Sequence, residues 1–178
     1  MNILFTVVIL IASILLRIIP HSPNVAAIGA IALWSGATLP KRWGWIVPLA
    51  AMAVSDSMIG FYDVKLMGVV YASFILYALV GWTVRGTTSV TRLIGATLGA
   101  STLFFLITNF AVWALSNWYP HTPQGLLWAY TLGLPFFRNT LLGDLGYTGV
   151  IFGAYRIIAI VLHNRTYRSK FFLKFLTV

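Results

Sequence analysis

The sequence predicts an all-α polytopic membrane protein, a bundle of six transmembrane helices that forms one domain over residues 1–178. Hydrophobic residues make up 60% of the 178 residues and charged residues only 8%, with a mean hydropathy of +0.90. The apolar residues also gather in several runs that approach the roughly 20 residues needed to cross a bilayer. The chain has no cysteine, which excludes disulfides and thiolate metal sites.

The first three spans are expected at residues 3–19, 25–39 and 45–60. The first run lacks the positively charged start of a signal peptide, so we expect it to be retained as a helix. It ends at the segment 20–24, where Pro20 and Pro23 forbid a continued helix. The second span ends at Pro40, and the third contains Pro48.

The last three spans are expected at residues 66–82, 92–117 and 136–163, with a polar loop at 85–89 between the first two of them. The longer connection 118–135 is expected to contain a short interfacial or re-entrant helix at 124–134. The basic tail 164–178 alternates charged and aromatic residues, a pattern that suits a membrane surface. We find no internal repeat and no linker that would indicate a second domain.

The loop charges predict that the N and C termini are both cytoplasmic. In this orientation nine positive charges and no negative ones lie on the cytoplasmic side, and three charges of each sign lie on the outer side. The cytoplasmic set is Lys41, Arg42, Arg85, Arg92, Arg156, Arg165, Arg168, Lys170 and Lys174. The outer set is Arg17, Lys65, Arg138, Asp56, Asp63 and Asp144. The net charge of +9 is therefore a topology signal and indicates no nucleic-acid partner.

Six strongly polar side chains from four spans are expected at one depth near the outer face. They are Arg17, Asp56, Asn109, Arg138, Asn139 and Asp144. Charged residues within a membrane are costly and mark pairing or binding, so this one-sided set predicts an outward-facing pocket for a small polar ligand. Arg138 and Asn139 are expected at the start of a helix, whose free N–H groups would favour an anionic or carbonyl-bearing group.

The outer loops around this pocket are suited to form a lid. The stiff, polar segment 20–24 carries His21 and Asn24, and the connection 118–135 carries His121. Aromatic residues in the outer loops could stack on a planar or bulky ligand, although each also fits the aromatic belt of a membrane interface. They are Tyr62, Trp118, Tyr119, Trp128 and Tyr130. The predicted ligand-binding set comprises Arg17, His21, Asn24, Asp56, Asn109, His121, Arg138, Asn139 and Asp144.

Two other interpretations of the polar residues stay open. The charges could form ion pairs that only fix helix packing, such as Arg17 or Arg138 with Asp56 or Asp144, in a structural or assembly protein that transports nothing. An intramembrane enzyme is the other interpretation. Because the sequence offers no nucleophile with an adjacent base, we expect no enzymatic activity, no catalytic residue and no cofactor.

The remaining motifs are weaker signals. The histidines have no metal-site spacing and predict no metal site, although His21 or His121 could serve as a single axial ligand. The pairs Gly95/Gly99 and Gly149/Gly153 are small-xxx-small motifs, which are expected to let helices pack closely, with a partner-binding role as the alternative.

Three blocks of the chain resemble signatures of a bacterial membrane family of largely unknown function. The blocks are Arg17-Ile-Ile-Pro-His-Ser-Pro-Asn24, Pro48-Leu-Ala-Ala-Met-Ala-Val-Ser-Asp56 and Pro135-Phe-Phe-Arg-Asn-Thr-Leu-Leu-Gly-Asp144. That family is similar to the S-components of energy-coupling-factor (ECF) vitamin transporters, and among these to solitary S-components proposed to carry cobalamin. The resemblance covers roughly residues 10–155.

The resemblance implies an S-component-like, multi-pass protein of the bacterial inner membrane that takes up a small organic molecule. The implied ligand is a vitamin, with cobalamin as the first candidate, and the lipid bilayer is the other partner. S-components that dock on a shared ATPase module typically carry Ala-xxx-Ala on the first helix. The first span here has none, whereas Ala26 and Ala30 provide one on the second, which favours a solitary protein. Cobalamin-type relatives are also associated with a cysteine that contacts the cobalt, so here His21 or His121 serves instead or the ligand differs.

Overall fold

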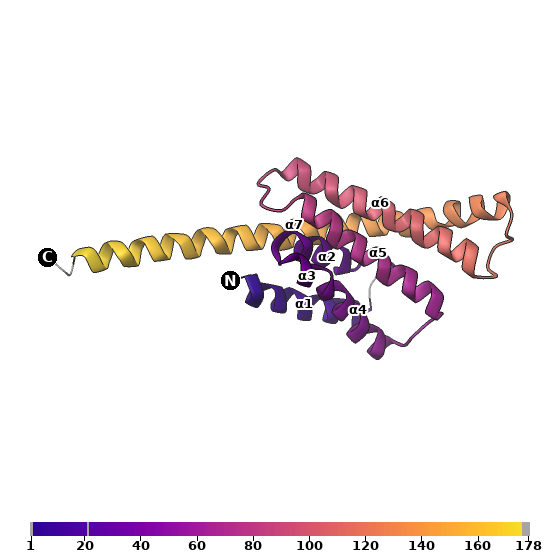
Figure 1. Cartoon of the computed structure of the whole chain (residues 1–178), viewed down its shortest axis with the longest axis horizontal. Helices are drawn as coiled ribbons and strands as arrows, with labels where there is room; N and C mark the ends of the chain where they lie inside the picture. Colours follow the sequence, from indigo (N-terminus) through magenta and orange to yellow (C-terminus); the bar gives the residue numbers. More distant parts are fainter. Residues whose placement is uncertain (1, 21, 176–178) are drawn as a thin grey trace.

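The fold is helical throughout the described residues, 2–20 and 22–175 of a computed structural model, with side chains described for 3–20 and 22–162. The helices are α1 (Asn2–Ile18), α2 (Ile28–Thr38), α3 (Lys41–Gly44), α4 (Ile46–Ile59), α5 (Val64–Thr83), α6 (Val90–Leu115) and α7 (Pro123–Phe175) (Figure 1). By length and composition, α5, α6 and Pro123–Leu162 of α7 can cross a membrane. The prediction of an all-helical membrane protein is confirmed at this level.

Helix α2 forms the centre of the bundle. All of its residues from Ile28 to Ala37 are buried, and it contacts α1, α4, α5, α6 and α7. Its sequence has no polar face, and a helix that is apolar all round is stable only when it is surrounded. Eleven residues of helix are about 16 Å long, roughly half the thickness of a bilayer core. The second expected span is therefore a short core helix in this structure.

Glycines let α2 and α5 approach each other closely. A Cβ atom added at Gly36 would lie 1.9 Å from the carbonyl oxygen of Ala78, and one added at Gly81 would lie 2.3 Å from the carbonyl oxygen of Leu33. The backbone of each helix thus rests against a glycine of the other. Such contacts replace bulky side chains with backbone packing, which is a common way to join helices in membranes.

The two glycine pairs singled out in the sequence do not have this role within the described chain. A Cβ added at Gly95, Gly99, Gly149 or Gly153 would meet no atom within 4 Å. The expectation that these pairs bring helices of this chain together was wrong. Small residues at spacing four permit close approach, but the sequence does not show which helix faces are turned inward.

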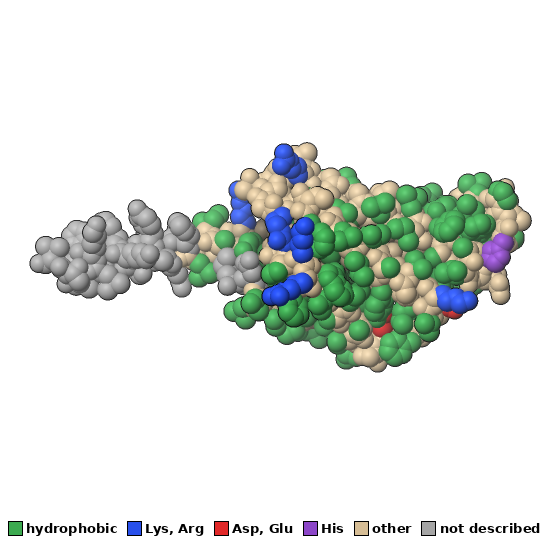
Figure 2. Space-filling view, viewed as in Figure 1, with side chains coloured by type: hydrophobic (Ala, Val, Ile, Leu, Met, Phe, Trp, Pro, Cys, Tyr) green, Lys and Arg blue, Asp and Glu red, His purple; other side chains and the backbone are tan. Residues whose placement is uncertain are grey.

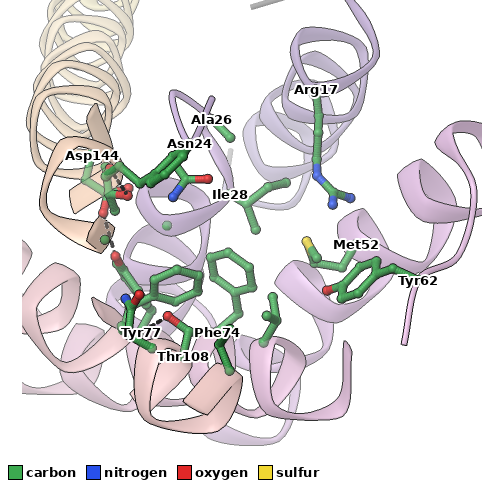
Figure 3. Close-up of a pocket in the computed structure, with 18 of the residues that line it drawn as sticks. Arg17, Asn24, Ala26, Ile28, Met52, Tyr62, Phe74, Tyr77, Thr108 and Asp144 are labelled. Carbon is green, nitrogen blue, oxygen red and sulfur yellow. Dashed lines mark hydrogen bonds between the residues drawn. The ribbon is translucent and has the colours of Figure 1, made fainter. Parts of the chain in front are cut away.

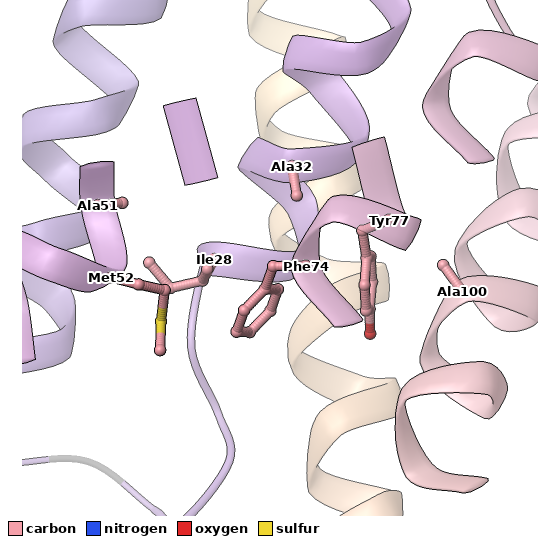
Figure 4. Packing of buried hydrophobic residues seen from close by; sticks show 7 residues of the cluster. All are labelled: Ile28, Ala32, Ala51, Met52, Phe74, Tyr77 and Ala100. Atoms are coloured by element: carbon pink, nitrogen blue, oxygen red, sulfur yellow. The ribbon is translucent and has the colours of Figure 1, made fainter. Parts of the chain in front are cut away.

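Two groups of buried side chains surround α2. One group joins α2 to α4 and α5 and includes Ile28, Met52, Phe74 and Tyr77 (Figure 4). On the other side, the ring of Trp34 packs against aromatic rings of α1 and α7. Its centroid lies 5.0 Å from that of Phe5, 5.3 Å from that of Phe152 and 4.4 Å from that of Tyr155.

Helix α7 continues without a break through Pro135. Its 53 residues correspond to about 80 Å, so its C-terminal part extends well beyond the bundle (Figure 1). The expected separate helix at 124–134 and the expected span at 136–163 are therefore one helix. A proline inside a helix removes one backbone hydrogen bond, and neighbouring helices in a membrane bundle compensate for this loss. Residues 164–175 of the predicted basic tail continue α7, and 176–178 lie outside the described residues.

Positive charges gather at one end of the bundle. Most of the lysine and arginine side chains visible in Figure 2 surround the end from which α7 extends. At this end Arg85 donates hydrogen bonds to the carbonyl oxygens of Gly36, at 3.1 Å, and Leu39. These bonds satisfy the carbonyl groups that are left free at the C-terminus of α2.

Candidate functional site

A cavity of about 620 Å³ opens at the opposite end of the bundle. Its walls come from the last turn of α1, the start of α2, and α4, α5, α6 and α7. The connections 22–27, 60–63 and 116–122 lie at its mouth, with Asn24, Tyr62, Trp118 and Tyr119 among the lining residues. The cavity is thus formed where helices diverge, and loops far apart in the sequence meet around it.

An ion pair stands on one side of the cavity. The Arg17 guanidinium lies 2.6 Å from the Asp56 carboxylate and also donates a hydrogen bond to the Ser55 hydroxyl. Asp56 is only 1% exposed and accepts a further hydrogen bond from the Tyr71 hydroxyl at 2.9 Å. Arg17 lines the cavity and is 18% exposed, whereas Asp56 lies behind it. The positive charge of Arg17 is therefore largely neutralised within the protein.

Asp144 stands on the other side, across the cavity from Arg17 (Figure 3). It is 3% exposed and accepts hydrogen bonds from the Tyr77 hydroxyl at 2.5 Å and the Ser101 hydroxyl at 2.6 Å. Neither donor is charged, and Asp144 forms no ion pair with any described residue. The cavity thus has two different polar sides, a neutralised ion pair and a carboxylate held by two hydroxyl groups.

Apolar and aromatic side chains fill the wall between these polar groups. Phe74, Phe104 and Phe136 line it, together with Met52. At the mouth, burial and the Asp56 carboxylate raise the pKa of the Tyr62 hydroxyl, an effect that Arg17 opposes. Tyr62 is therefore a neutral phenol at physiological pH. A largely apolar wall with a few fixed polar groups is the usual composition of a small-molecule pocket.

The structure brings together part of the predicted binding set. The cavity is lined by four of its members: Arg17, Asn24, Asn109 and Asp144. Asp56 contacts Arg17 from behind, as described above. Asn139 donates a hydrogen bond to the Pro23 carbonyl oxygen at 3.0 Å and so ties the connection before α2 to α7. Asn139 thus bonds to the protein backbone and does not line the cavity.

The other members lie elsewhere. Arg138 is exposed and does not line the cavity. His121 also lies outside the lining, hydrogen-bonded to the Ser116 carbonyl oxygen at 3.2 Å with its ring against Trp113. His21 falls outside the described residues. Because α7 begins at Pro123, Arg138 and Asn139 are in a helix interior, and the expected free N–H donors for an anion are not there.

Four hydroxyl groups outside the predicted binding set hold the two acids and Arg17 in place. They belong to Ser55, Tyr71, Tyr77 and Ser101. The only signal in the sequence is that each lies within an apolar run, where hydroxyl groups are common and usually bond to their own helix. Within the described residues, no three histidine, aspartate or glutamate side chains are close enough to hold a metal ion.

The chain belongs to a family of unknown function, DUF6580, whose family model matches residues 1–167. Comparisons with curated proteins and with solved structures found no match.

Proposed function

We propose that this member of the DUF6580 family is a membrane uptake protein that binds a small organic molecule in the cavity between Arg17 and Asp144. The observation that carries the proposal is the cavity itself. Its volume of about 620 Å³ lies within the roughly 300–1,000 Å³ range of pockets that enclose small organic ligands. It also combines aromatic walls with polar groups from α1, α6 and α7, which could orient such a ligand.

The proposed orientation places the cavity on the outer side of a bacterial inner membrane. Lysine and arginine are enriched in the cytoplasmic loops of membrane proteins. The cavity opens at the end away from the main group of positive side chains, so it would face outward in a multi-pass protein with both termini in the cytoplasm (Figure 2). A ligand would then enter from outside between the loops that carry Tyr62 and Trp118.

A vitamin is the first ligand class to test, because three blocks of the sequence resemble S-component-like proteins. Cobalamin remains the first candidate by that resemblance. A corrin with its nucleotide loop is a large ligand, so we expect its binding to require movement of the loops at the mouth. A smaller vitamin would fit without such movement.

We propose that the protein works without an ECF-type ATPase module. The one Ala-xxx-Ala motif considered for docking consists of Ala26 and Ala30. Ala30 is 1% exposed at the centre of the bundle, and Ala26 lines the cavity. Neither residue forms part of an outer surface on which another protein could dock. The proposal also includes no chemical change of the ligand.

A structural role is the second candidate, favoured by the ion pair of Arg17 with Asp56. An ion pair that only fixes helix packing needs no open space beside it. The cavity lies directly against this pair and has the volume of a ligand site, which argues for binding.

Ligand binding by the purified full chain in detergent tests the proposal. A panel of vitamins that includes cobalamin is measured by thermal denaturation and titration calorimetry. A compound that binds the folded state at a hundred times its Kd adds about 2.7 kcal/mol of stability, so a clear rise in Tm is expected for the ligand. Binding of none of the compounds, by either measurement, would count against the proposal.

A matched pair of variants locates the binding. Thr108 lines the cavity, and its hydroxyl bonds only to the Phe104 carbonyl oxygen in its own helix, at 2.8 Å. Thr108→Trp should fill the cavity and abolish binding. Thr102 lies on the same helix, is exposed, and makes the same kind of bond to Leu98 at 2.8 Å. Thr102→Trp should bind the ligand like the wild type, and equal behaviour of the two variants would place the binding elsewhere.

A further inference from the structure

The charges at the cavity do not balance. Among the described residues, three charged side chains line the cavity or pair with a lining residue. They are Arg17, which is positive, and Asp56 and Asp144, which are negative. Arg17 pairs with Asp56, and no cation among the described residues pairs with the Asp144 carboxylate. Burying an unpaired carboxylate is unfavourable, and two hydroxyl donors offset this cost only in part. A positive group brought by a ligand would complete the site.

One oxygen of Asp144 is available for such a group. The hydrogen bonds from Tyr77 and Ser101 both go to Oδ2. Among the described residues, none donates a hydrogen bond to Oδ1. Gly29, which also lines the cavity, lies beside this atom: a Cβ added there would lie 2.3 Å from Oδ1. The Asp144 carboxylate therefore packs directly against the backbone at the start of α2, a close approach that requires a glycine at position 29.

Aromatic rings stand next to this carboxylate. The rings of Phe74, Tyr77 and Phe104 form a cluster on the cavity wall, with centroids 5.1–6.0 Å apart. The faces of aromatic rings attract cations, most strongly where water is excluded. A hard inorganic cation prefers several oxygen ligands, carboxylates among them, and Asp144 is the one carboxylate among the described residues that line the cavity. A carboxylate beside aromatic rings suits an ammonium group carried on an apolar body.

We infer that the ligand of the cavity is an organic cation, whose ammonium or protonated amine group binds Asp144 Oδ1 while its apolar body lies against the aromatic cluster. This inference rests on the proposed function of the cavity and names the chemical class of its ligand. It departs from the sequence-based expectation of an anionic or carbonyl-bearing group near Arg138. That expectation required a helix start at Arg138, which α7 does not have.

Three probes of similar shape and different charge test the inference. They are tryptamine, tryptophol and indole-3-acetate, which carry an ammonium group, a hydroxyl group and a carboxylate on an indole. Calorimetry on the purified full chain should give an affinity for tryptamine at least about tenfold above that for tryptophol, equivalent to about 1.4 kcal/mol, with indole-3-acetate weakest. Equal affinities, a preference for the anion, or binding of none of the three would overturn the inference.

Two isosteric variants assign the preference to Asp144. Asp144→Asn keeps acceptors for Tyr77 and Ser101 but removes the charge, so the preference for tryptamine over tryptophol should disappear. Asp63 caps α5 by accepting a hydrogen bond from the Leu66 N–H at 2.9 Å and does not line the cavity, so Asp63→Asn removes an equal charge outside the site. Asp63→Asn should keep the preference. Thermal denaturation of both variants checks that they are folded.

The binding measurements distinguish failure of this inference from failure of the proposed function. If a neutral or anionic vitamin binds in the cavity, with binding lost in Thr108→Trp and unchanged in Asp144→Asn, the cavity binds ligands but the assignment to cations is wrong. If neither the vitamins nor the three indole probes bind, the proposed function fails together with the inference.

Discussion

Replacing Arg17 with glutamine would remove the positive partner that the described residues supply to a deeply buried carboxylate. Asp56 is 1% exposed, its nearest cation is the Arg17 guanidinium at 2.6 Å, and only the Tyr71 hydroxyl would remain to stabilise its charge. Removing one member of a buried ion pair typically costs about 3–5 kcal/mol. Because Arg17 itself is 18% exposed, some water reaches the pair, and we expect a loss of about 3 kcal/mol.

Thermal and denaturant unfolding in detergent measure this loss. For a chain of this size, about 3 kcal/mol corresponds to a fall in Tm of roughly 6–12 °C. Asp56→Asn should cost less, about 1–2 kcal/mol, because the Arg17 guanidinium that it leaves unpaired lies at the cavity and can be hydrated. The double variant Arg17→Gln/Asp56→Asn should be more stable than the sum of the two single losses predicts, since it leaves no unpaired charge.

Arg138 provides the matched control for this experiment. It is also an arginine of the predicted binding set, but it is exposed and forms no ion pair among the described residues. Arg138→Gln should therefore change stability by no more than about 0.5 kcal/mol. Equal destabilisation by Arg17→Gln and Arg138→Gln would refute the assignment of the ion pair to Arg17 and Asp56.

Two further predictions concern packing and the connection before α2. Gly36→Ala places a Cβ 1.9 Å from the Ala78 carbonyl oxygen and should lower Tm strongly, whereas Gly95→Ala meets no atom within 4 Å and should raise stability by up to about 1 kcal/mol through its helix propensity. Similar Tm values for the two variants would contradict the close packing of α2 on α5. Asn139→Ala removes the bond to the Pro23 carbonyl oxygen and should speed hydrogen exchange in the connection 19–27 without exposing the helices. Unchanged exchange there would show that this bond does not hold the connection.

The helix pattern was largely predictable because hydropathy and loop charge decide it locally. The expected bounds of the first, third, fourth and fifth spans differ from α1, α4, α5 and α6 by one or two residues. The caps explain part of the difference: Asp63 and Ser89 accept hydrogen bonds from the first turns of α5 and α6, and these helices begin directly after them. The length of α7 was not predictable from Pro135, since a proline ends a helix only when nothing else supports the backbone around it.

The candidate site was predictable in its residue types but not in its pairing. The depth of Arg17, Asp56 and Asp144 follows from counting along helices, and all three lie at or beside the cavity. Which acid Arg17 selects depends on how α1 packs on α4, and this information is not local in sequence. The consequence is large, because a pairing of Arg17 with Asp144 would have left a site without the free carboxylate from which the ligand class is inferred.

Native mass spectrometry of the protein as purified from membranes shows whether the cavity binds a ligand. The wild type and Thr102→Trp should each carry a bound small molecule, and Thr108→Trp should carry none. The same adduct on all three proteins, or no adduct on the wild type together with no stabilisation by any compound of the panel, would contradict the account.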